Sequence, residues 1–268
     1  MDKALTVRQE TSLAAAMPGL EGFEGIDLVR DLKVPVVKIV HGTSKMEGAG
    51  KHGGDFYNTI SGEFVERLQV VPLVVGKARA KFNKDEDKPD CKSNDCITGT
   101  TYGECARCQF NANIHQSLWQ KDERGDRPAH CDEGFRFLLY MPEEMSYGIF
   151  NASKTNVNPA KLLITRLIQN GKKAIGVMAP YGALWEFSTV QQSAPGKQWY
   201  QLAPRFLRWH TPEEIAEYRA LAAKMSATDY EEVEDDAPVG DYIDADATPI
   251  YAGESYQAPP PAPKSELF

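Results

Sequence analysis

The sequence predicts a mainly β, α+β fold, and three observations support this prediction. Several stretches rich in β-branched and aromatic residues alternate apolar with polar side chains, which is the period of a half-buried strand. Only two stretches carry clear helix signals. All five cysteines lie between residues 91 and 131, in a polar segment that interrupts the expected strands. We therefore expect a sheet that forms the body, a few helices and one inserted subdomain.

Seven stretches carry the strand pattern, and two of them read as a hairpin. We expect strands at residues 34–40, 55–63, 64–82, 134–141, 172–178, 184–190 and 198–203. The stretch 64–82 is long enough to be a strand pair. Pro195 and Gly196 separate the last two stretches, which predicts a β-hairpin.

The two helices are predicted from their first residues. The helix at 158–170 has Asn158 as N-cap, Pro159 in its first turn and Gly171 just beyond its end. The helix at 211–226 opens with the sequence Thr-Pro-Glu-Glu, a capping box in which the first and fourth residues exchange hydrogen bonds. Apolar side chains recur at helical spacing in both stretches, so each helix should cover part of the sheet.

The cysteine segment, residues 83–131, has the residue types of a structural zinc site. Cys105 and Cys108 are separated by two residues, a spacing at which a tight turn presents two thiolates to one metal. The segment is too long and polar for an ordinary loop, and a metal could replace its missing core. Four thiolates leave no open position, so the expected Zn²⁺ is structural. The favoured ligands are Cys91, Cys105, Cys108 and Cys131.

Other readings of the cysteines remain open. Cys96 could take the place of Cys131, and His115 or His130 could replace any member of the set. A disulfide pair, a redox-active C-x-x-C and free thiols are the non-metal alternatives.

Charge divides the chain into a nearly neutral body and an acidic tail. Residues 226–268 contain eleven Asp or Glu and one Lys, which is a net charge of −10, whereas the whole chain has −8. The body is therefore slightly basic, at +2. We expect a flexible N-terminal arm at 1–25, one domain at 26–226 and a disordered tail at 227–268. No stretch has the length of a signal peptide or a membrane span, which predicts a cytoplasmic protein with no membrane partner.

The residue types favour binding over catalysis. No G-x-S-x-G or H-E-x-x-H motif is present and the five histidines are scattered, so no enzyme is expected. Aromatic and basic residues are instead interleaved along the predicted strands. Such strands hold single-stranded nucleic acid by stacking on bases and following phosphates, although many strand aromatics are simply core. The candidate contacts are Lys77, Arg79, Lys81, Arg107, Trp119, Arg136, Trp185, Phe187, Lys197, Trp199 and Tyr200.

Two features resemble known proteins. The acidic tail closing on Leu267 and Phe268 is similar to the tails of bacterial and T7-type phage single-stranded DNA-binding proteins. The order of Cys-x-Ser-Asn, Gly-x-Cys-x-x-Cys, Trp119 and a last cysteine before an apolar strand resembles phage proteins of the same class. This resemblance covers residues 34–209 at the level of pattern. It departs at Cys96 and at Gln109, where that pattern has proline.

The resemblance implies an OB-like barrel with an inserted four-cysteine zinc subdomain and a protein that coats single-stranded DNA in phage replication or recombination. The tail, through Leu267 and Phe268, would then recruit replication proteins. In a phage-infected cell this protein would act in the host cytoplasm. Two alternatives remain: a zinc-containing interaction or assembly factor that binds no nucleic acid, and a metal-dependent nucleic-acid-processing enzyme.

Overall fold

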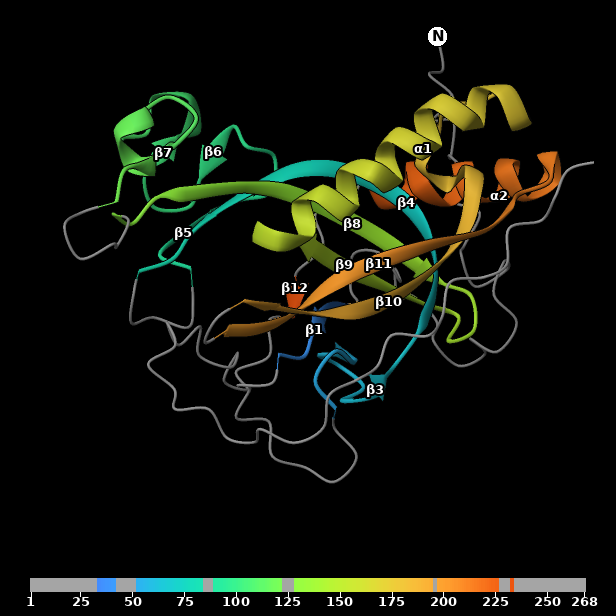
Figure 1. Cartoon of the computed structure of the whole chain (residues 1–268). Helices are drawn as coiled ribbons and strands as arrows, with labels where there is room; N and C mark the ends of the chain where they lie inside the picture. Colours follow the sequence, from blue (N-terminus) through green and yellow to red (C-terminus); the bar gives the residue numbers. More distant parts are fainter. Residues whose placement is uncertain are drawn as a thin grey trace, which may run out of the picture.

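The computed structural model describes residues 33–41, 52–83, 89–121, 128–194, 197–226 and 232–233. These residues form a mainly β structure, a curled half-barrel sheet with two α-helices (Figure 1). The strand order is β11-β10-β4-β8-β9-β1-β2-β3, with β12 paired to β1 and β5 paired to β4. The mainly β, α+β prediction is therefore confirmed.

The strands and helices have the following bounds. The strands are β1 Val34–Ile39, β2 Phe56–Asn58, β3 Phe64–Val65, β4 Leu68–Lys81, β5 Cys91–Ser93, β6 Thr98–Gly99, β7 Gly103–Glu104, β8 Cys131–Met141, β9 Ser146–Ala152, β10 Ala183–Ala194, β11 Lys197–Trp209 and β12 Glu232–Val233. The helices are α1 Val157–Ile175 and α2 Pro212–Ser226, with short 3-10 turns η2 Cys105–Arg107, η3 Gln116–Trp119, η4 Lys154–Asn156 and η5 Pro180–Gly182.

Strand β4 connects the parts of the sheet, because it changes partners along its length. Its first residues pair with β10, its long second part pairs with β8, and its last three residues also pair with β5. The register with β8 shifts between Pro72 and Val74. Proline has no N–H to donate, so it is tolerated in a sheet at such an irregularity. The expected strand pair at 64–82 is thus the short strand β3 followed by one long, curled strand.

The two faces of the sheet carry separate apolar cores. On one face, side chains of β4, β8, β9, β10 and β11 surround residues such as Phe137 and Phe187, and α1 packs against them. On the other face Leu73, Leu138 and Ile149 meet Ala222 and Met225 of α2. The alternation along β8 explains this division, because Phe137 and Leu139 face one core and Leu138 faces the other.

Helix α1 is longer at its C-terminal end than the sequence indicates. It continues through Gly171 and ends at Gly176, which has φ 75° in the left-handed region. The predicted strand at 172–178 is therefore wrong, because residues 172–175 are the last turn of this helix. The N-cap is Asn156 instead of Asn158, and its side-chain oxygen accepts a hydrogen bond from the N–H of Leu202 at 2.7 Å.

Helix α2 and the last hairpin agree with the sequence. Thr211 donates its N–H to Glu214 at 2.9 Å, and Glu214 donates its N–H to the Thr211 hydroxyl at 3.3 Å, so the capping box is formed. Strands β10 and β11 pair in antiparallel register from Ala183–Trp209 to Ala194–Lys197, which confirms the hairpin. Both strands run further than the stretches 184–190 and 198–203.

Gly171 lies in the middle of α1 because the chain folds back onto it. A Cβ atom at this position would lie 2.8 Å from the carbonyl oxygen of Val177 and 3.7 Å from the ring of Trp209. We expect Gly171→Ala to lower the free energy of unfolding by about 1–3 kcal/mol, as overpacking does, although alanine is otherwise the better helix former. Urea denaturation measures this change. The exposed control Gln169→Ala should stay within about 0.5 kcal/mol of the parent, and equal stability of the two variants would contradict the close contact.

Candidate functional site

The cysteine subdomain, defined as the described residues between β4 and β8, is attached to the end of β4. Lys81 is paired in register with Cys91 of β5 on one side and with Cys131 of β8 on the other. The hairpin β6–β7 follows β5 and leads into η2, which carries Cys105. The turn at η2 is closed by the N–H of Cys108 donating to the carbonyl of Cys105 at 3.4 Å. Cysteines far apart in the sequence are therefore brought to one end of the sheet.

Four of the five cysteines line one small cavity. Cys91, Cys105, Cys108 and Cys131 all border a space of about 10 Å³, while Cys96 does not. A Cβ atom at Gly99 would lie 2.7 Å from the sulfur of Cys91 and 3.9 Å from that of Cys105. Within the described ranges, however, no three His, Cys, Asp or Glu side chains are arranged as ligands of one metal ion.

The thiols of this cavity differ in acidity. Burial, opposed by Arg79 and assisted by the neighbouring thiols of Cys105, Cys108 and Cys91, raises the pKa of Cys131 to about 12. Burial also opposes ionisation of Cys91, but hydrogen bonds from the backbone at Thr101 and Tyr102 outweigh it and lower its pKa. The four thiols are thus close enough to influence one another.

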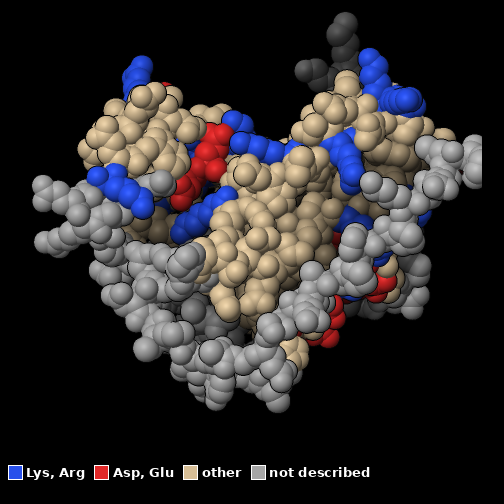
Figure 2. All heavy atoms as spheres, viewed as in Figure 1, with Lys and Arg blue, Asp and Glu red and all other residues tan. Residues whose placement is uncertain are grey.

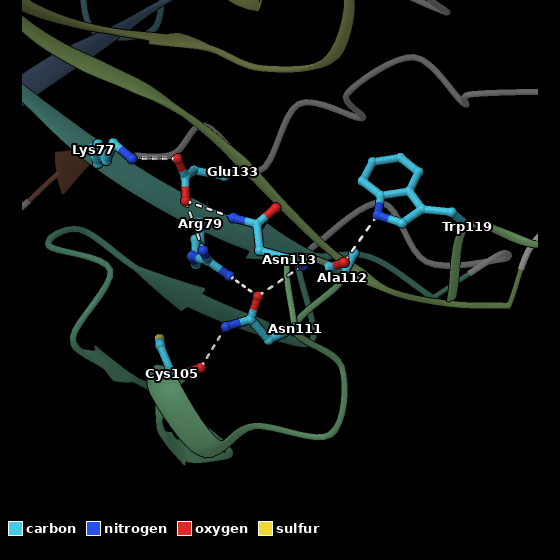
Figure 3. Close-up of polar contacts among 8 residues, drawn as sticks. All are labelled: Lys77, Arg79, Cys105, Asn111, Ala112, Asn113, Trp119 and Glu133. Carbon is cyan, nitrogen blue, oxygen red and sulfur yellow. Dashed lines mark hydrogen bonds and ion pairs between the residues drawn. The ribbon is translucent and has the colours of Figure 1, made fainter. Parts of the chain in front are cut away.

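Arg79 joins the sheet to the cysteine subdomain (Figure 3). Its side chain is 8% exposed and pairs with Glu133 of β8 at 2.6 Å. It also donates to the side-chain oxygen of Asn111, whose amide donates in turn to the carbonyl of Cys105 at 2.8 Å. Glu133 accepts further bonds from Lys77 at 2.6 Å and Asn113 at 3.0 Å. Burial raises the pKa of Glu133, but its hydrogen bonds with the two cations outweigh burial and lower that pKa overall.

Lys81 is held in the same way on the next row of the strand. Its side chain is 4% exposed and pairs with Asp90, while Asn83 accepts a hydrogen bond from it at 2.7 Å. The ammonium also lies 4.4 Å from the ring centroid of Phe110. Arg79 and Lys81 were both predicted to contact nucleic acid, but in this conformation both are buried and paired with carboxylates, so neither charge faces solvent. Lys77 is 58% exposed and shares the carboxylate of Glu133.

Trp185 and Phe187, which were predicted to stack on bases, are buried in this conformation. Their exposed fractions are 1% and 0%. Trp185 packs edge-on against Phe206 at 5.6 Å, and Phe187 against Phe150 at 5.7 Å. Both side chains point into the core beneath α1. This is why they alternate with more polar residues along the strand and share one of its faces.

The remaining candidates lie in several places. Trp119 is 46% exposed, donates its indole N–H to Ala112 at 2.9 Å and packs against His130. Arg107 is 87% exposed. Arg136 and Trp199 are half-buried on β8 and β11.

Tyr200 is half-buried as well, and its ring fills the space over a glycine pair, since a Cβ at Gly53 would lie 2.5 Å from it. The side chain of Lys197 and all of the arm 1–25, the tail segments 227–231 and 234–268, Leu267 and Phe268 lie outside the described residues.

Phe82, which directly follows β4, is a candidate that the sequence pattern did not single out. Its ring is 40% exposed, and the ammonium of Lys154 lies 5.6 Å from its centroid. An aromatic face beside a cation suits a nucleotide, which offers a base and a phosphate. The sequence feature that could have identified Phe82 is its position as the last residue of a predicted strand, directly before a polar segment.

Comparison with known proteins places the chain in a phage family. The family model described as Pam3 phage gp34-like protein matches residues 7–229. The chain belongs to this family. No curated protein and no solved structure is significantly similar to it. In the described part of this family member, no helix is long and apolar enough to span a membrane.

The Arg79–Glu133 pair yields a prediction about stability. Glu133→Gln leaves a buried guanidinium without its counter-charge, and we expect a loss of about 3 kcal/mol at neutral pH, measured by urea denaturation. The exposed control Glu104→Gln removes only the surface pair with Arg107 and should change stability by less than about 0.5 kcal/mol.

The pH dependence of this loss has a definite sign. Because the pKa of folded Glu133 lies below its ordinary value of 4.5, the carboxylate stabilises the fold above that pH. Its contribution disappears as the pH falls through the lowered value. The difference between parent and Glu133→Gln should therefore shrink in acid, and a difference independent of pH would contradict the pairing.

Proposed function

We propose that this phage protein binds single-stranded DNA through an open OB-type barrel. The observation that carries the proposal is the strand connectivity. If β4, β8, β9, β10 and β11 are numbered one to five, their order in the sheet is five-four-one-two-three, and α1 lies between the third and fourth. This is the order of an OB barrel, although here β1 takes the position beside β9 that the fifth strand would occupy on closure.

The connectivity assigns roles to two connections. In OB folds the ligand crosses the outer face of strands two and three, between the loop that joins strands one and two and the loop that joins strands four and five. In this chain the first loop is the cysteine subdomain. The second is the tip of the β10–β11 hairpin, which is flanked by Lys197 and Trp199. The cysteine subdomain and the described ends of β10 and β11 next to this tip both lie toward the left of Figure 1.

The outer face of the second and third strands offers polar groups beyond the edge of α2. Arg136 is paired in register with Gly76 on one side and Asn151 on the other. Lys38 follows the Val37–Phe150 pair, which places it beside Asn151. This row combines two cations with an exposed amide and a glycine that leaves room for a base. It supports phosphate contacts from Lys38 and Arg136 in place of those expected from Arg79 and Lys81.

The proposal includes a structural zinc ion. Cys91, Cys105, Cys108 and Cys131 fit the chemistry of such a site, because four thiols from three segments border one cavity and Cys96 stays outside it. Arg79 and Lys81 border the same cavity, and each is also paired with a carboxylate. The metal would tie β5, the η2 turn and β8 together.

Replication or recombination is the process in which such a protein would act, with no catalytic step of its own. The acidic residues after Val233 would recruit partner proteins and compete with DNA for the cationic surface. The host cytoplasm is where these steps occur for a phage protein.

DNA binding is tested by fluorescence titration of the full chain with an unstructured oligonucleotide at two salt concentrations. We expect binding that weakens as salt rises, since counterions leave the phosphates on binding. A full-length variant in which Asp235, Asp236, Asp241, Asp244 and Asp246 are replaced by Asn should bind more tightly and show a steeper salt dependence. Absence of binding at low salt by both proteins would refute the proposal.

Metal content tests the zinc site separately. Freshly purified protein should contain about one equivalent of zinc. Cys105→Ser should lose the metal and loosen the cysteine subdomain, as seen by proteolysis between residues 83 and 131. Cys96→Ser, the matched control, should keep both. Less than about half an equivalent in the parent protein, or equal loss in the two variants, would contradict the assignment.

A further inference from the structure

The outward face of α1 is basic along its whole length. Between Met145 and Trp185 the chain contains five Lys or Arg residues and neither Asp nor Glu. These cations are Lys154, Lys161, Arg166, Lys172 and Lys173. All five are exposed, while α1 packs on the core through Ala160, Leu163, Leu167 and Gly171. In Figure 2, Lys and Arg spheres are spaced along α1, and no Asp or Glu sphere lies over it.

Among the described residues, the four cations on α1 have no acidic partner. No carboxylate in the described ranges pairs with Lys161, Arg166, Lys172 or Lys173. Two exposed arginines of β11 are paired with carboxylates instead: Arg205 with Glu186 at 2.9 Å and Arg208 with Glu214 at 2.7 Å. Helix α2 mixes both signs, with Glu213 and Glu214 in its first turn and Lys224 in its last. The exposed face of α1 therefore differs from α2 and β11, because its charged side chains are all positive and have no carboxylate partner in the described residues.

The basic face begins where the DNA site ends. Lys154 precedes α1 in η4 and lies over Phe82, the first residue after β4. Phe82 is at the root of the cysteine subdomain, one of the two connections that border the ligand in an OB fold. From Lys154 the cations continue along a helix of 19 residues, about 28 Å of path.

We propose that α1 binds the phosphate backbone of the part of the single strand that extends beyond the barrel. The inference rests on the proposed DNA binding and extends it to a second contact surface. The cations hold phosphates without reading sequence, and the exposed Leu162 and Ile168 lie between them, where they contact sugars or unstacked bases. The occupied length of DNA is then greater than one barrel covers.

The double reversal Lys161→Glu/Lys172→Glu tests this surface with two oligonucleotides, one of about 8 and one of about 30 nucleotides, chosen because one OB fold covers about 4–16. The parent should bind both. The variant should bind the short strand like the parent and the long strand more weakly. The slope of log affinity against log salt for the long strand should fall by about 1.4, since each lost phosphate contact on a single strand contributes about 0.7.

The matched control is Arg67→Glu/Arg219→Glu, which makes the same change in charge at exposed positions outside α1. It should follow the parent on both strands. Unaltered circular dichroism and melting temperature in all proteins exclude unfolding as the cause.

Several results would overturn the inference. The inference fails if the α1 variant binds the long strand as tightly as the parent. It also fails if the substitutions weaken binding to both lengths equally, or if the control variant shows the same effect. None of these results refutes the proposed function. Binding of the parent to phosphatidylserine vesicles that the α1 variant loses, with DNA binding unchanged, would assign the face to an anionic membrane instead. A parent that binds neither oligonucleotide refutes the proposed function itself.

Discussion

The structure depends on the continuity of β4. This one strand pairs with β10 at its start, with β8 along most of its length and with β5 at its end, so the half-barrel and the cysteine subdomain share a backbone ladder. The irregularity at Pro72–Val74 allows the strand to curl between its partners. Because the ladder is continuous, the position of the cysteine subdomain relative to the barrel is fixed by backbone hydrogen bonds and by the buried pair of Arg79 and Glu133.

Because Arg79 and Lys81 are buried, the row of basic residues on β4 has a structural role. Alternation correctly predicted that Lys77, Arg79 and Lys81 share a face. The alternation could not show that Glu133 and Asp90 lie on the same face. In the case of Glu133 this depends on the pairing of two strands whose residues are more than fifty positions apart in the sequence. The row therefore holds two parts of the protein together. The face of one charge sign lies on α1 instead, where the sequence pattern drew attention only to the apolar side.

The sequence predicted local features well and their tertiary context poorly. The capping box at Thr211 and the hairpin at 183–209 are specified by neighbouring residues, and both are present. The sequence alone predicts a helix end at Gly171, because glycine usually stops helices. Its actual role, a close approach of Val177 and Trp209, depends on how the chain folds back. Trp185 and Phe187 could be assigned to one face of a strand, but only the packing of α1 and β11 shows that this face is the core. Spacing predicts the four-cysteine set, and the fold brings those four thiols to one cavity.

The ends of the sheet have a consequence for how the protein behaves at high concentration. In the described part of the chain, one end of the sheet is β3, which has only two residues, and the other is β11, which has thirteen. A long unpaired strand edge can recruit the same edge of another molecule and begin aggregation. Along β11, Pro204 removes one hydrogen-bond donor, and the N–H of Leu202 is already donated to Asn156 at 2.7 Å. These features disfavour pairing of this edge with the same edge of a second molecule.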